Sequence, residues 1–134
     1  MAYEKIMIRI TMIETQVSFI QKWIPRTFKE YQTDSKTQAA IERYLQTSIE
    51  ALLEICIQMV KYFELGTPNS VDDVLELLSK NVQTTTQIKS LKKFRNVLVH
   101  QYDTIKNELV FDYIPRFVKD IKIIIKELKQ ILSK

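Results

Sequence analysis

The segment "RYLQTSIEALLEICIQMVKYFELGTPNSVDDVLELLSK", residues 43–80, contains the clearest folding signals of the chain. Its apolar residues recur every three or four positions, which is the spacing of one face of an α-helix. Gly66 is a typical helix-ending residue, and Pro68 lies just beyond it. Ser70 and Asp73 then have the spacing of a capping box, which begins a new helix. The segment therefore predicts a long helix over about 35–65, a turn and a short helix.

The same periodicity extends outward to both ends of the chain. An isoleucine-rich stripe over 6–24 predicts a first helix that Pro25 ends or bends, with a short helical piece over 26–31. A fourth helix carries residues 94–103, and a last one covers most of 108–132, kinked or restarted at Pro115. One glycine and three prolines leave few turn residues for a sheet. We expect an all-α, antiparallel bundle of four to five helices, with part of the broad apolar surface of the first helix shared with a second chain.

Composition also excludes several classes of protein. The longest run without Asp, Glu, Lys or Arg is residues 81–88, so we expect no membrane span. Charges interrupt the apolar N-terminus, which is unlike a signal peptide. Cys56 is the single cysteine, lies on an apolar helix face and cannot form an intramolecular disulfide. These features favour a cytoplasmic protein that has no membrane contact.

Charge is distributed unevenly along the chain. Residues 1–88 contain 9 Lys/Arg against 11 Asp/Glu, whereas residues 89–134 contain 11 against 5. A basic C-terminal part suggests an anionic partner such as nucleic acid, and the alternative is a solvated face that only confers solubility. Lys92 and Lys93 are candidate RNA contacts, together with a stripe of lysines on the last helix. That stripe consists of Lys119, Lys122, Lys126 and Lys129.

The stretch "FRNVLVHQYD", residues 94–103, contains the only histidine of the chain, His100. On a helical wheel the apolar residues Leu91, Phe94, Val97 and Leu98 fall on one side. A mostly polar arc lies opposite and includes Lys92, Arg95, Asn96, His100, Tyr102 and Asp103. Asn96 and His100 are four residues apart, so the amide can orient the imidazole.

Arginine and histidine together suit cleavage of an RNA phosphodiester by its own 2′-hydroxyl. Arg95 offers a planar fork for phosphate, and His100 can move a proton near neutral pH. No metal is needed for this reaction, and the sequence presents no obvious set of metal ligands. If imidazoles serve as both general acid and general base, two histidines are required, and a two-fold dimer would supply them. The alternative is that Tyr102 or water serves as the second group. The competing interpretation is that these are ordinary surface residues of a packed helix.

The octapeptide "RNVLVHQY", residues 95–102, resembles the Arg-x(4–6)-His signature of the HEPN superfamily. With tyrosine two residues after the histidine, it looks more narrowly like the HepT-like toxins. Residues 43–80 also resemble that family's second helix, turn and third helix. The resemblance implies one HEPN-like helical domain over residues 1–134. It also implies a metal-independent ribonuclease without cofactors, which works as a homodimer with Arg95 and His100 as catalytic pair and Asn96 in support.

The resemblance further implies a partner, an MNT-type nucleotidyltransferase that acts as antitoxin and transfers AMP onto Tyr102. The alternatives are that the partner acts by steric block, or that the chain is a non-catalytic, nucleotide-binding or substrate-presenting subunit of a nucleotidyltransferase. A third interpretation is an interaction bundle with no ligand. The sequence does not indicate which RNA is cut.

Overall fold

The computed structural model describes residues 1–99 and 104–134, without the side chains of 104–106. All regular structure in this part is helical, which confirms the all-α prediction. The short piece expected over 26–31 is a distinct helix, α2, so the described residues form six helices where four to five were expected. The helices are α1 (Ala2–Trp23), α2 (Phe28–Thr33), α3 (Ser35–Tyr62), α4 (Val71–Leu78), α5 (Thr85–Val99) and α6 (Thr104–Leu132).

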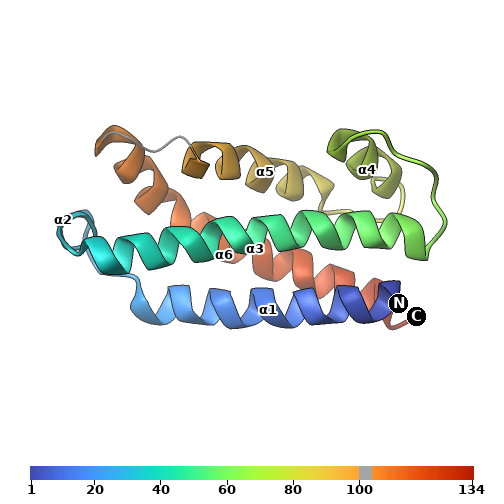
Figure 1. The fold of residues 1–134 in the computed structure, drawn as a ribbon, viewed down its shortest axis with the longest axis horizontal. Helices are drawn as coiled ribbons and strands as arrows, with labels where there is room; N and C mark the ends of the chain where they lie inside the picture. Colours follow the sequence, from blue (N-terminus) through green and yellow to red (C-terminus); the bar gives the residue numbers. More distant parts are fainter. Residues whose placement is uncertain (100–103) are drawn as a thin grey trace.

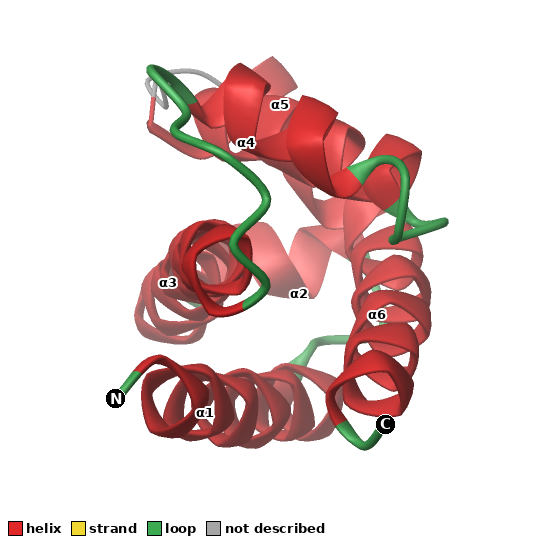
Figure 2. Ribbon diagram, turned by 90° about the vertical axis from the view of Figure 1, so that its right-hand side faces the viewer, coloured by secondary structure: helices red, strands yellow, loops and turns green. Residues whose placement is uncertain are grey.

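The bundle is built around the antiparallel pair α1 and α3, which lie side by side along the long axis (Figure 1). Seen from one end, α1 lies on one side of the bundle and the α4–α5 pair on the opposite side, with α3 and α6 between them (Figure 2). The predicted isoleucine stripe of α1 is buried, from Ile6 at 0% exposure to Val17 at 5%. Burying one such side chain contributes roughly 1.5–3 kcal/mol, so this stripe alone strongly favours the pairing.

The outer face of α1 is also apolar. Ile8 and Trp23 are 68% and 58% exposed, and Met12 and Phe19 lie on the same side of the helix. A monomeric protein seldom exposes a stripe of this kind, which is consistent with contact to another chain.

The end of α3 differs from the prediction at Gly66. Phe63 caps the helix, and Glu64 adopts the left-handed conformation (φ 53°) that glycine usually supplies. The N–H of Leu65 then donates to the carbonyl of Val60 at 3.0 Å, which completes a Schellman motif. Gly66 is nevertheless needed, because its φ is 145° and a Cβ there would lie 3.2 Å from Leu77.

The start of α4 and the course of α6 follow the sequence more closely. The hydroxyl of Ser70 accepts from the N–H of Asp73 at 3.1 Å, as the capping signal predicts. Pro115 lies inside a continuous α6 and does not restart it. The helix bends along its length (Figure 1), as expected where proline removes a backbone donor. None of the helices in the described ranges is long and apolar enough to cross a membrane.

Candidate functional site at helix α5

The two residues that precede α5 are held by a side chain of the last helix, α6. The carboxylate of Glu127, on α6, accepts hydrogen bonds from the N–H of Gln83 at 2.6 Å and from Thr84. Thr84 donates both its N–H, at 3.0 Å, and its hydroxyl, at 2.7 Å. A negative charge at a helix N-terminus is favourable, since the first N–H groups have no partner within the helix. Thr84 directly precedes α5, and no local pattern in the sequence indicates Glu127 as its partner.

We expect Glu127→Gln to destabilise the fold. The amide keeps one accepting oxygen, but its NH2 group replaces the other oxygen and faces a backbone N–H, so two donors oppose each other. Hydrogen bonds to a charged group contribute about 1.5–3 kcal/mol each. The free energy of unfolding should fall by about 2 kcal/mol in urea denaturation. Glu108→Gln, on an exposed position of the same helix, is the matched control. Equal stability of the two variants would contradict the role given to Glu127.

The apolar face of α5 packs as predicted. Leu91, Phe94 and Leu98 are buried, and Val97 is partly buried against the core. The Phe94 ring contacts Tyr113 of α6, with 4.3 Å between ring centroids. This packing fixes the rotation of α5 about its axis and thereby decides which residues face outward.

Arg95 is half-buried and Asn96 is exposed on the flank away from this apolar contact. Lys92 lies on the same side as Arg95, but its ammonium is already paired with Asp72 of α4 at 2.8 Å. The hydrogen bond from Lys92 lowers the pKa of the exposed Asp72 carboxyl, which favours its carboxylate form. Lys93 lies about 160° from Arg95 around the helix. The structure thus separates the two lysines that the sequence grouped together.

Lys93 borders a cavity of about 350 Å³ between α5 and α6, which the sequence did not reveal. Arg116 and Tyr113 form its other wall. Among the described residues the buried Tyr113 hydroxyl has no hydrogen-bond partner, and burial raises its pKa. Arg116 lies 3.6 Å from Asp120, measured from Nε to Oδ2.

His100 and Tyr102 lie outside the described residues, between Val99 at the end of α5 and Thr104 at the start of α6. The expected contact between Asn96 and His100 stays a prediction. Within residues 1–99 and 104–134, no group of three or more His, Cys, Asp or Glu residues is arranged to hold a metal ion. Cys56 is fully buried, and burial raises the pKa of its thiol to about 12, which suits a core residue and not a nucleophile.

The described part is thus a helical bundle with an arginine on the outer flank of one helix, five residues before the only histidine in the sequence. The model of the family "Ribonuclease HepT-like" matches residues 13–128. The chain belongs to this family of HepT-like ribonucleases, as its motif predicted.

Individual proteins agree with this assignment. The mRNA nuclease HepT of Shewanella oneidensis is 27% identical over 104 residues, covering 75% of this chain and 78% of that protein. A mutant of the toxin–antitoxin complex MntA–HpeT contains a chain with a TM-score of 0.83 and 22% identity, covering 95% of this chain and 98% of the other. A tri-AMPylated HEPN toxin of Shewanella oneidensis, in complex with its MNT antitoxin, gives a TM-score of 0.79 at 22% identity, covering 94% and 97%. The two structural likenesses establish the HEPN toxin fold.

Proposed function

We propose that this protein is a metal-independent endoribonuclease toxin whose catalytic pair is Arg95 and His100. The observation that carries the proposal is the match to the HepT-like ribonucleases across residues 13–128, a range that contains both residues. The outward position of Arg95 on α5 supports it, since a guanidinium must be reachable by a phosphate.

The chemistry assigns a role to each group. The His100 imidazole takes the proton of a ribose 2′-hydroxyl, and the resulting oxygen attacks the adjacent phosphorus. The bond from phosphorus to the 5′-oxygen breaks, and that oxygen receives a proton from an acid. Arg95 stabilises the negative charge that builds on the phosphoryl oxygens. The products are a 2′,3′-cyclic phosphate and a 5′-hydroxyl. Asn96 has a supporting role, because its amide orients the imidazole of His100.

The need for an acid besides the base favours a homodimer, in which the second His100 serves as that acid. The two copies of α5 would then face each other across one cleft. Helix α1, which carries the exposed apolar residues, lies on the opposite side of the bundle from α5 (Figure 2). A two-fold contact between the α5 helices would therefore leave those residues free. The dimer thus rests on the chemistry of the cleft, and the α1 stripe is a separate contact surface.

We also propose that a cognate nucleotidyltransferase silences the toxin by adenylylating Tyr102. The complex of a tri-AMPylated HEPN toxin with an MNT antitoxin supports this for a relative of the same fold. Tyr102 is the tyrosine two residues after His100, in the position of the family motif.

The ion pair between Lys92 and Asp72 gives a prediction on RNA affinity. Asp72→Asn should release Lys92 for a phosphate on the Arg95 side of α5, and RNA should bind about threefold more tightly. An exposed ion pair contributes about 0–1 kcal/mol, so the fold should tolerate the change. Fluorescence anisotropy with labelled RNA, in a His100→Ala background, measures the affinity. Asp112→Asn makes the same change in net charge at another exposed site; an equal gain there would indicate a general charge effect.

The experiment that tests the proposed function is cleavage of RNA by the purified chain in excess EDTA. Mass spectrometry first confirms that Tyr102 carries no AMP. Cleavage that leaves cyclic phosphate ends would support the mechanism, whereas cleavage that disappears in EDTA and returns with Mg²⁺ would contradict metal independence. Unmodified protein that binds RNA without cutting it would favour a non-catalytic subunit.

A further inference from the structure

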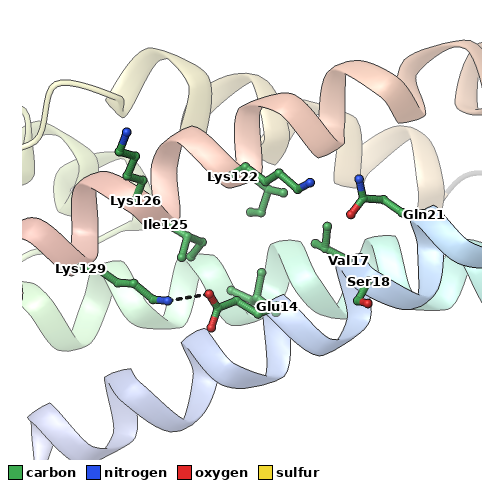
Figure 3. Close-up of a pocket in the computed structure, with 10 residues that line it drawn as sticks. Glu14, Val17, Ser18, Gln21, Lys122, Ile125, Lys126 and Lys129 are labelled. Atoms are coloured by element: carbon green, nitrogen blue, oxygen red, sulfur yellow. Dashed lines mark hydrogen bonds and ion pairs between the residues drawn. The ribbon is translucent and has the colours of Figure 1, made fainter.

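A groove of about 370 Å³ lies between α1 and α6, where these helices diverge. Its floor is apolar and consists of buried core side chains of both helices, Ile13 and Val17 from α1 with Ile121 and Ile125 from α6. Ser18 and Gln21 of α1 add neutral hydrogen-bonding groups along one wall (Figure 3). A volume of this size falls within the range of sites that bind small organic groups.

The α6 wall of the groove is strongly basic. It carries Lys122, Lys126 and Lys129, whereas Glu14 is the one acidic residue of the lining. Lys129 reaches across to Glu14 at 2.6 Å, and both side chains are nearly half exposed (Figure 3). An exposed pair of this kind is weak, so an incoming phosphate can compete for the lysine. Within the described ranges, neither Lys122 nor Lys126 has a carboxylate at salt-bridge distance.

The spacing of these charges suits a chain of phosphates. Lys122 and Lys126 are one helical turn apart, about 6 Å along the axis, and Lys119 continues the row toward the start of α6. An apolar floor beside a row of ammonium groups matches a nucleotide unit, whose base is flat and apolar on its faces and whose phosphate is anionic. The polar edge of such a base would find Ser18 and Gln21 on the facing wall.

We propose that this groove binds a single-stranded segment of the RNA substrate, with an unpaired base over the apolar floor and backbone phosphates on Lys122 and Lys126. The proposal rests on the ribonuclease function and adds a second RNA site to it. The groove lies between α1 and α6. Helix α5, which carries Arg95, crosses the side of the bundle opposite α1 (Figure 2). The groove therefore takes no part in the chemistry and raises the affinity most for RNAs long enough to reach both places.

Two variants test the groove by different means. Lys122→Gln/Lys126→Gln removes the charges, and Ser18→Trp fills the groove from an exposed position without altering charge. The control is Lys61→Gln/Lys80→Gln, which removes two exposed lysines elsewhere. All are made in the His100→Ala protein and compared by circular dichroism, and their Kd for a labelled, unstructured RNA of about forty nucleotides is measured at several salt concentrations.

We expect the lysine variant to bind this RNA about tenfold more weakly, with the slope of log K against log salt reduced by about 1.4, the value for two phosphates of a single strand. Ser18→Trp should also weaken binding, with a smaller change in slope. An RNA of about six nucleotides is too short to span both sites, so the groove variants should weaken its binding less than they weaken binding of the long RNA. In the active protein, the groove variants should raise KM for the long RNA and leave kcat unchanged.

Several outcomes would overturn the proposal. One is that both groove variants bind the long RNA with the same affinity as the Lys61→Gln/Lys80→Gln control. Another is unchanged RNA binding together with lost binding of the nucleotidyltransferase, which would make the groove a protein contact. Failure of the ribonuclease function is distinguishable, because an inactive wild type whose RNA binding still depends on the groove would refute the catalysis and retain the groove.

Discussion

His100→Ala is expected to lower the rate of RNA cleavage by about 10²–10⁴-fold, the usual contribution of a general acid or base. In a two-fold cleft the loss should lie at the upper end of this range, because one substitution removes the imidazole from both copies of the chain. The rate is measured by single-turnover cleavage of labelled RNA at saturating protein, so that a change in RNA affinity does not alter the measured rate. A cleavage rate equal to that of the wild type would show that the activity belongs to another site or to a contaminant.

Arg95→Ala should produce a loss of similar size by a different route, since it removes the cation over the reacting phosphate. Arg95→Lys should recover only part of the rate, because an ammonium keeps the charge but lacks the planar fork that holds two phosphate oxygens. Lys89→Ala is the matched control, as it removes one positive charge from an exposed position of the same helix. If Lys89→Ala and Arg95→Ala lost activity equally, net charge and not the position of the guanidinium would explain the effect.

The helices could be predicted because their signals are local. The stripe of α1 and the capping serine of α4 each depend on residues within one or two turns, so the sequence displays them directly. The end of α3 was misassigned at Gly66 because Glu64 takes the left-handed conformation, which glycine adopts at far lower cost. The sequence alone therefore favoured Gly66 as the helix-ending residue, whereas the structure has this glycine two positions after Glu64, beside Leu77.

The surroundings of the candidate site depend on contacts between distant parts of the chain. Glu127 anchors Thr84 from 43 positions away, and no spacing rule connects the two. The pairing of Lys92 with Asp72 is equally non-local, although a helical wheel already separates Lys92 from Lys93 by about 100°. The basic C-terminal part was visible in the charge distribution. That several of its lysines border an apolar groove became apparent only once α1 and α6 were placed together.

Tyr102→Phe is expected to keep ribonuclease activity and to escape the nucleotidyltransferase completely. In the proposed silencing, the tyrosine oxygen attacks the α-phosphorus of ATP, the tyrosyl–phosphate bond forms and pyrophosphate leaves. The product carries a bulky, anionic group on the sequence motif that contains Arg95. This group competes for the guanidinium and repels an incoming RNA phosphate. Phenylalanine keeps the aromatic ring but lacks the oxygen that must be modified, so no such group can be attached.

The measurement is RNA cleavage after incubation with the cognate nucleotidyltransferase and ATP, with the mass of the toxin recorded in parallel. Tyr113→Phe is the matched control: it removes a hydroxyl from a described tyrosine of α6 that has no hydrogen-bond partner within the described residues. That variant should gain AMP and lose activity as the wild type does. Silencing of Tyr102→Phe without any mass increase would show that the partner blocks the cleft by binding alone. A mass increase on Tyr102→Phe would instead place the modification on another residue. Only an unmodified and unsilenced Tyr102→Phe protein agrees with covalent control through this hydroxyl.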